Sequence, residues 1–290
     1  MTASPKTISE IVQERFETLT RAERQLANSL LENYPVSGLA SITAVAKKAD
    51  VSTPTVARMV QKLGFKGFPT FQAALRSELE AKISNPIVKH DLWAENAPDT
   101  HILNRFAESV VQNLHQTLAQ LDPETFDKTC ELLADPERSI FIAGGRITRT
   151  LADYLFSLMR MVRPKVTLVR SGASAWPDFL LDVKAGDVLV MFDIRRYENH
   201  ILRLAEIAEE KDIRIVIFTD QWGSPITKYA THCFNCRIEA PSAWDSIAVM
   251  LMLVETMVAQ IQSATWETTY ERMTDLEGMF DRTGLFRKFK

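Results

Sequence analysis

A face of hydroxyl and cationic side chains is expected between residues 53 and 62, and it consists of Thr53, Thr55, Arg58 and Lys62. Hydroxyl, guanidinium and ammonium groups bond phosphate oxygens, and an arginine also bonds the edge of a guanine in the major groove. These residue types, brought to one side of a helix, are typical of a surface that binds DNA. To present these side chains together, the segment must form a helix whose opposite side is buried in the protein.

The sequence marks where that helix begins. Ser52 is a good N-cap, and Pro54 is tolerated in the first turn, where no backbone donor is lost. Val51 and Val56 stand at the spacing of a hydrophobic staple. The buried side of the helix is expected to consist of four apolar residues: Val56, Met59, Val60 and Leu63.

A shorter amphipathic helix is predicted just before it. Its apolar residues have the i, i+3, i+4, i+7 spacing of one buried face: Ile42, Val45, Ala46 and Ala49. Asp50 and Val51 then break the pattern. Two short helices joined by a tight turn are the layout of a DNA-reading helix-turn-helix. The same pattern also fits two helices of a bundle whose basic face is merely solvated.

The distribution of charge favours the DNA-binding interpretation. Residues 43–76 contain six cations and one anion, whereas the whole chain has a net charge of −3. Residues 1–82 hold 11 lysines and arginines against 8 acidic residues, and the rest of the chain holds 23 against 29. The front of the chain is therefore expected to attract polyanions. The residues expected to contact DNA are Lys47, Lys48, Ser52, Thr53, Thr55, Arg58, Lys62 and Lys66.

Length and composition indicate a two-domain, soluble protein. The chain has 290 residues, of which 46% are hydrophobic, and its three cysteines do not suggest a disulfide framework. No apolar run approaches the roughly 18 residues that a membrane helix needs, and the N-terminus lacks the apolar centre of a signal peptide. We expect a cytoplasmic protein without a membrane segment.

Hydrophobic patterning divides the chain into four parts. Residues 1–82 are predicted to be all helical, with a capping box between Thr20 and Glu23. Residues 83–122 are predicted to be a linker, irregular over 84–98, followed by a connecting helix. In residues 123–265, apolar runs alternate with helices from Ser139 onward, and residues 266–290 form a helical or tail-like end.

Continuous apolar runs that alternate with helices indicate strands buried on both faces of a parallel sheet. The predicted fold class is thus an all-α helix-turn-helix domain followed by a doubly wound α/β domain, with a five-stranded, mostly parallel sheet.

The chain resembles the MurR/RpiR family of bacterial transcriptional regulators, in which a helix-turn-helix domain precedes a sugar isomerase (SIS) domain. The resemblance rests on SITAVAKKADVSTPTVARMVQKLGFKGF in front, and behind on IFIAGGRITRTLADYL and the stretch from DVLVMF to ITKYA. It implies a homodimer or homotetramer that represses or activates transcription at a double-stranded DNA operator. It also implies a phosphosugar or related metabolite as the effector.

The two SIS loops depart from the family pattern. The first loop, G-x-G-x-S in the family, places small residues and a hydroxyl at a helix N-terminus, where a phosphate is favoured. Here it runs from Gly144 to Thr148, with Arg146 in place of the second glycine. The second loop, usually S-x-S-G-x-T, runs from Asp193 to Glu198 and has lost all its hydroxyls.

Two interpretations of these loops remain open. Three arginines, Arg146, Arg195 and Arg196, can clamp an anionic metabolite, because guanidinium groups bind carboxylate or phosphate with two parallel bonds. Alternatively, Arg195 and Arg196 pair with nearby acidic residues and the pocket binds nothing. The expected effector-site residues are Gly144, Gly145, Arg146, Thr148, Asp193, Arg195, Arg196, Ser224 and Ser242, with Ser171 as a further hydroxyl contact.

Other chemistry-bearing residues are interpreted as structural. Cys233 and Cys236, three apart on a predicted strand, point to opposite faces, so neither a metal nor a cofactor is expected. Ser242 and Asp245 are expected to cap the last helix of the α/β domain.

The sequence is compatible with three functions. The leading interpretation is a regulator, not an enzyme, that senses an anionic metabolite such as a phosphosugar or sugar acid. A ligand-independent DNA-binding protein, with the SIS domain used only for oligomerisation, is the alternative. A sugar-phosphate isomerase is less favoured, because the altered loops remove the phosphate cradle.

Overall fold

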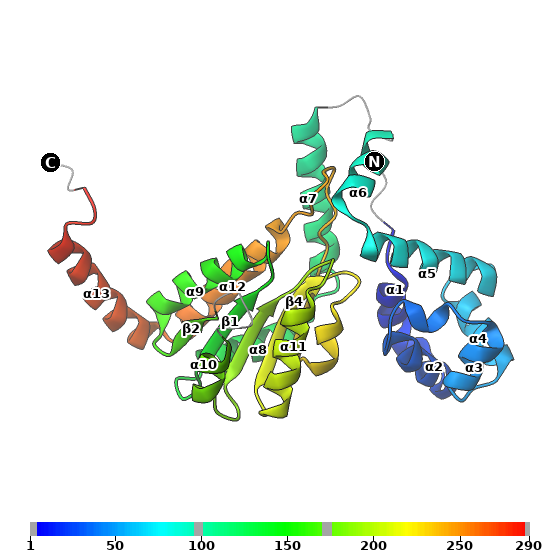
Figure 1. The fold of residues 1–290 in the computed structure, drawn as a ribbon, viewed down its shortest axis with the longest axis horizontal. Helices are drawn as coiled ribbons and strands as arrows, with labels where there is room; N and C mark the ends of the chain where they lie inside the picture. Colours follow the sequence, from blue (N-terminus) through cyan, green and yellow to red (C-terminus); the bar gives the residue numbers. More distant parts are fainter. Residues whose placement is uncertain (1–4, 96–100, 170–175, 288–290) are drawn as a thin grey trace. The chain divides into compact units, whose positions relative to one another are not determined.

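The computed structural model describes residues 5–95, 101–169 and 176–287 (Figure 1). The chain forms two compact units. The helical unit comprises residues 1–120, 220–223 and 237–245, and the sheet unit comprises residues 121–219, 224–236 and 246–290. Two short segments from the second half of the chain therefore belong to the helical unit.

Five helices of the helical unit share one apolar core: α1 (Ile8–Arg15), α2 (Arg21–Leu31), α3 (Ile42–Lys48), α4 (Thr53–Lys62) and α5 (Phe68–Ile83). The helices α6 (Pro86–Glu95) and α7 (Ile102–Leu118) follow them in the chain. The predicted capping box of Thr20 and Glu23 is present at the start of α2. Leu26, Met59 and Phe71 are fully buried in the common core of this unit.

The prediction of irregular structure over residues 84–98 is wrong for most of that stretch, because α6 occupies Pro86–Glu95. The Asn85 side-chain oxygen accepts hydrogen bonds from the backbone N–H groups of Ile87 (2.9 Å) and Val88 (3.0 Å). Asn85 therefore caps the helix, and Pro86 is its first residue, where a missing N–H does no harm. The sequence indicated this helix start only through the pair Asn85-Pro86, which is equally typical of a turn.

The sheet unit contains a five-stranded sheet in the order β2 (Val166–Leu168), β1 (Ile140–Gly144), β3 (Val188–Phe192), β4 (Arg214–Asp220), β5 (His232–Cys236). The pairs β1–β2, β1–β3 and β3–β4 are parallel. The predicted doubly wound fold is thus confirmed. Gly144 is in register with Phe192, so the loops after β1 and β3 leave the sheet side by side. The strand order reverses there, and doubly wound folds bind ligands at such a point.

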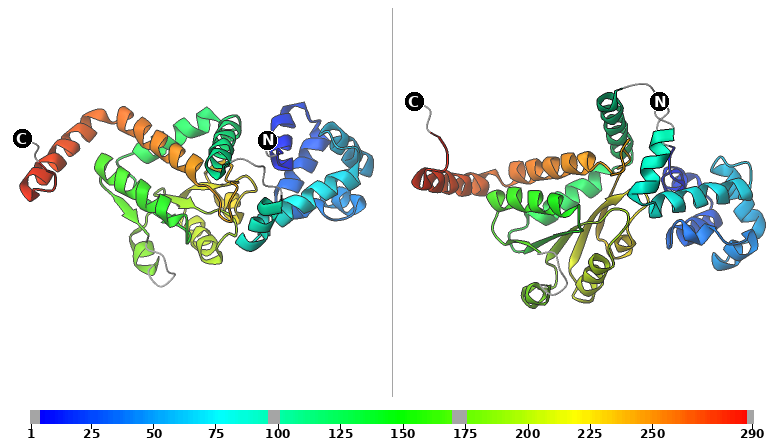
Figure 2. Two further views of the ribbon diagram at one scale, coloured as in Figure 1. Left: turned by 90° about the horizontal axis from the view of Figure 1, so that it is seen from above. Right: turned by 45° about the horizontal axis from the view of Figure 1, so that its top comes forward.

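Helices cover both faces of the sheet: α8 (Pro123–Ala134), α9 (Arg149–Val162), α10 (Trp176–Asp182), α11 (Asn199–Glu210) and α12 (Ala248–Ala264). Helix α13 (Trp266–Thr283) contacts α9 and α12 and extends away from the sheet (Figure 1). Side chains alternate along each strand, so Phe141 and Leu189 pack with α10 and α11. The opposite face lies against α9, which also contacts α12 (Figure 2). On this sheet the rings of Phe192, Phe218 and Phe234 stack with 4.9 Å between successive centroids.

The expected caps of the last SIS helix are incorrect. Helix α12 begins at Ala248, without a side-chain cap. The Asp245 carboxylate instead accepts from the Lys89 ammonium group at 2.6 Å, and the Ser242 hydroxyl accepts from the Trp244 backbone N–H at 3.1 Å. Both residues thus have local roles in the helical unit.

Among the described residues, no single helix is both long and apolar enough to cross a membrane. Of the described helices, only α12 and α13 together have the required length and composition, and they are bent by 104° at the break between them.

Candidate nucleic-acid interface and ligand site

The start of α4 has the predicted geometry. The Ser52 hydroxyl accepts from the Thr55 backbone N–H at 3.3 Å, and the two hydroxyl oxygens lie 2.8 Å apart. Pro54 lies in the first turn of the helix. Asp50 has a φ of 51° in the turn between α3 and α4, a left-handed conformation that aspartate adopts more readily than most residues. The N-cap at Ser52 is therefore confirmed.

The exposed face of α4 differs in part from the predicted face. Thr55 is buried and bonded to Ser52, so the expectation that it points outward is wrong. Pro54, Arg58 and Gln61 are exposed and Ala57 is half-buried between them, at positions three or four residues apart. Such spacing places all four on one side of the helix. Gln61 was missed because the prediction selected hydroxyl and cationic side chains only.

Lys62 is tied to the helical unit. Its ammonium group lies 3.0 Å from the Glu23 carboxylate and donates to the Thr18 carbonyl at 2.8 Å. Burial alone would raise the pKa of Glu23, but hydrogen bonds from the Thr20 backbone and Lys62 outweigh it and the pKa is lowered. Lys62 therefore helps to hold α4 against α2, and a contact with DNA would compete with this ion pair.

The other cations predicted to contact DNA lie on the surface. Lys47, Lys48 and Lys66 are exposed, as is Ser52, and Thr53 is half-buried. The Lys48 ammonium group donates to the Ser37 hydroxyl at 3.2 Å. Whether these residues bind DNA stays a prediction.

In the sheet unit, the loop after β1 packs closely against the start of α9. A Cβ on Gly144 would lie 2.7 to 2.8 Å from backbone atoms of Thr148 and Arg149, so only glycine fits there. The buried Thr148 hydroxyl accepts from the Gly145 N–H at 2.9 Å and donates to the Phe192 carbonyl at 2.7 Å. This hydroxyl thus joins the ends of β1 and β3 and faces the protein rather than solvent.

A glutamate from the second loop reaches the first loop. The Oε1 atom of Glu198 accepts from the Arg146 backbone N–H at 2.5 Å. A Cβ on Gly145 would lie 2.7 Å from the same oxygen. The Oε2 atom lies 2.9 Å from Nε2 of His200, whose ring stacks on Trp176 with 5.8 Å between centroids. Glu198 was not among the predicted site residues, because its reach across to Gly145 is a tertiary feature.

Asp193 links the same loop to Ser224. Its buried carboxylate accepts from the Ser224 hydroxyl at 2.5 Å and from the Glu198 backbone N–H at 3.4 Å. Arg146 and Arg196 are exposed, and Arg195 is half-buried.

The predicted ligand-site residues are only partly brought together. Gly145, Arg146, Thr148, Asp193 and Ser224 are linked through this set of contacts. Ser242 belongs to the other unit, and Ser171 lies outside the described residues.

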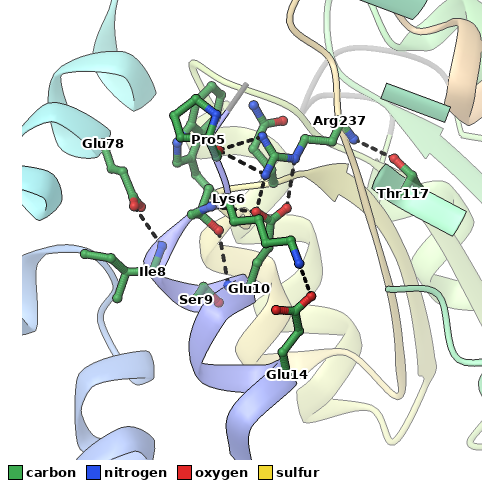
Figure 3. A network of polar contacts seen from close by, with 12 residues as sticks. Pro5, Lys6, Ile8, Ser9, Glu10, Glu14, Glu78, Thr117 and Arg237 are labelled. Atoms are coloured by element: carbon green, nitrogen blue, oxygen red, sulfur yellow. Dashed lines mark hydrogen bonds and ion pairs between the residues drawn. The ribbon is translucent and has the colours of Figure 1, made fainter. Parts of the chain in front are cut away.

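The helical unit also contains a buried ion pair that the sequence did not predict (Figure 3). The Arg237 guanidinium group contacts both oxygens of the Glu10 carboxylate, at 2.9 Å for one of them, and donates to the Pro5 carbonyl. Arg237 and Glu10 are 2% and 4% exposed. The Arg237 backbone N–H donates to the Thr117 hydroxyl at 3.0 Å. Within the helical unit, the pair therefore fastens α1 to the segment 237–245.

Glu78 lies beside this pair with one oxygen in use. Its Oε1 accepts from the Ile8 backbone N–H at 2.8 Å, whereas the buried Oε2 has no hydrogen-bond partner among the described residues. Burial, aided by the Glu10 charge, raises the pKa of Glu78 to about 7. As the pH rises, the unfolded chain therefore loses the Glu78 proton near pH 4.5, whereas the folded protein keeps it until about pH 7.

Replacement of Glu78 by glutamine is expected to stabilise the helical unit at alkaline pH. A raised carboxyl pKa gives stability that is full below pH 4.5 and is lost as the pH rises through about 7. Glu78→Gln should thus raise the free energy of unfolding by about 1 to 3 kcal/mol at pH 8, with little change at pH 5. Urea denaturation at both pH values measures this. Glu80→Gln, an exposed neighbour, is the control, and an equal response of both variants would contradict the assignment.

Both halves of the chain match known protein families. Residues 6–82 match the helix-turn-helix domain of the rpiR family, and residues 132–260 match the SIS domain. The transcriptional regulator HexR of Pseudomonas aeruginosa is 25% identical over 235 residues, which cover 79% of each chain. HexR of Escherichia coli is 25% identical over 225 residues, 77% of this chain and 75% of that one.

Solved structures share the fold. The Vibrio vulnificus NanR protein complexed with ManNAc-6P superposes with a TM-score of 0.56 at 18% identity, covering 96% of this chain and 100% of that one. The sugar isomerase domain of an RpiR transcription factor from Sphaerobacter thermophilus gives 0.57 at 18% identity, over 61% of this chain and 99% of that one. From the two matched domains and the named relatives, the chain belongs to the RpiR family of transcriptional regulators, with a helix-turn-helix domain in front of a SIS domain.

Proposed function

We propose that this regulator binds a specific DNA sequence through α4, as a homodimer or homotetramer, and that its SIS domain senses an anionic metabolite. The observation that supports the DNA-binding role best is the exposed face of α4. Arg58 and Gln61 lie on it, three residues apart, and neither side chain makes a hydrogen bond or ion pair within the described residues. Arginine pairs with guanine and glutamine with adenine in the major groove.

The surrounding charges suit the same role. Lys47, Lys48 and Lys66 are exposed near α4 in the sequence, and phosphate contacts by such cations position a reading helix without specifying the sequence. A regulator with one reading helix per chain covers two half-sites as a dimer, so a palindromic or repeated operator is expected. Its place of action is the bacterial cytoplasm, on the nucleoid.

The metabolite-sensing role is supported by the loops after β1 and β3. They carry Arg146, Arg195 and Arg196 at a point where doubly wound folds bind ligands. NanR, which shares the fold, was solved with a phosphosugar, ManNAc-6P. We therefore place a phosphosugar or a sugar acid at these loops as the effector of this chain.

We propose that the segments 220–223 and 237–245 carry the effect of the ligand to the helical unit. Residues 220–223 and 237–245 lie within the SIS match yet pack in the helical unit. A shift at the end of β5 would move Arg237, and with it Glu10 at the start of α1. A ligand that favours one arrangement of β5 would thus alter the placement of the reading helix.

Selection from random DNA by the full-length protein tests the proposal. We expect enrichment of a sequence with two copies of a half-site, and a change in affinity for it when phosphosugars or sugar acids are added. Enrichment that no metabolite alters would favour ligand-independent DNA binding, an alternative supported by the Glu198 carboxylate in the first loop. Failure to enrich any sequence would contradict specific binding by α4.

A further inference from the structure

We infer that Glu198 is an internal occupant of the anion position in the first SIS loop, and that it makes the ligand site select against phosphate monoesters. This inference rests on the proposed function, because it concerns the same loops. It narrows the effector to a ligand without a phosphate at that position, such as a sugar acid held by arginine side chains.

The first loop is built to hold a negative group. The backbone N–H of Arg146 lies in the loop just before α9, near the positive end of the helix dipole, where anions are stabilised. Gly145 lets an oxygen approach the loop closely, because it has no Cβ. The Oε1 atom of the Glu198 carboxylate lies only 2.7 Å from the point where a Cβ would stand.

Other contacts hold the carboxylate in place. His200 binds its second oxygen at 2.9 Å, and Trp176 supports the imidazole ring by stacking. The Glu198 backbone N–H in turn donates to the buried Asp193 carboxylate, which also binds Ser224. The side chain is therefore fixed by contacts at both carboxylate oxygens, and the segment that carries it is fixed through Asp193.

A phosphate dianion cannot share this position with a carboxylate. It would have to displace Glu198 from the Arg146 N–H, and the buried Asp193 would remain close to the same segment of the loop. Like charges in one site oppose each other, and an intramolecular group competes at a high effective concentration. A ligand whose acid group binds the exposed Arg146 or Arg196 side chain avoids this competition.

Titration calorimetry on the full-length protein tests the inference. The probes are inorganic phosphate, ManNAc-6P and gluconate, added to the wild type, Glu198→Thr and Glu198→Gln. The expected result is at least a roughly tenfold gain in affinity for the two phosphate compounds in Glu198→Thr, with a smaller gain in Glu198→Gln. Glu210→Gln, which removes one exposed charge from the far end of α11, should show no gain.

Two results would overturn the inference. One is wild-type binding of ManNAc-6P as tight as that of Glu198→Thr, and the other is the absence of any gain in both Glu198 variants. If Glu198→Thr fails to fold by circular dichroism, Glu198→Gln decides alone, because it preserves the shape of the side chain. The selection of DNA by the wild type is a separate readout, so loss of the DNA-binding proposal leaves the phosphate comparison interpretable.

Discussion

Replacement of Arg237 by alanine is expected to lower the free energy of unfolding of the helical unit by about 3 to 5 kcal/mol. The buried Glu10 carboxylate would lose its cation, and the Pro5 carbonyl would lose a donor. A carboxylate that is 4% exposed cannot recover this interaction from water. Hydrogen exchange of the peptide that spans α1 measures the effect, because it reports on the helical unit alone.

Two companion variants separate the ion pair from a general loss of charge. Arg21→Ala removes an exposed arginine at the start of α2 and should change stability by less than about 0.5 kcal/mol. The double variant Glu10→Met with Arg237→Met should recover much of the loss, since apolar residues often replace a buried ion pair without penalty. A loss below about 1 kcal/mol in Arg237→Ala would show that the pair does not fasten α1.

Replacement of Arg58 by alanine should weaken binding to the selected DNA about 10- to 100-fold, the loss expected for one bidentate contact with a guanine. Arg58 is exposed on α4 and unengaged among the described residues, so the fold should be unaffected. Fluorescence anisotropy with labelled DNA gives the two affinities.

Two further variants test whether this effect comes from base reading. Arg76→Ala removes the same charge from the exposed side of α5 and should lower the affinity less than threefold, as about one weak phosphate contact would. Gln61→Ala should relax the preference at one base pair instead of weakening all sequences equally. Equal losses in Arg58→Ala and Arg76→Ala would mean that α4 supplies charge only.

The features predicted from the sequence depend on neighbouring residues. The Ser52 cap, the Thr20–Glu23 box and the strands of the sheet each follow from residues within a few positions of one another. The buried faces of α3 and α4 followed from helical spacing. Such features can be predicted from the sequence because they depend on the local geometry of the backbone.

The features that were not predicted are of two kinds. Some join residues that are far apart in the chain, and others depend on which nearby partner a side chain bonds. Glu10 and Arg237 are 227 residues apart, and no pattern in either segment announces their pairing. Glu198 was visible as a lost hydroxyl, yet its contact with the first loop depends on strand register. Thr55 was placed outside because its type suits DNA, whereas its hydroxyl is bonded to Ser52.

Two affinities of the wild-type protein, measured at physiological salt, decide whether α4 reads a DNA sequence. The dissociation constant for random DNA, divided by that for the selected sequence, gives the specificity ratio. Base reading by α4 should give a ratio of at least about a thousand, the lower range for proteins that read bases through the major groove. A ratio near one would contradict it, since α4 would then bind DNA by charge alone.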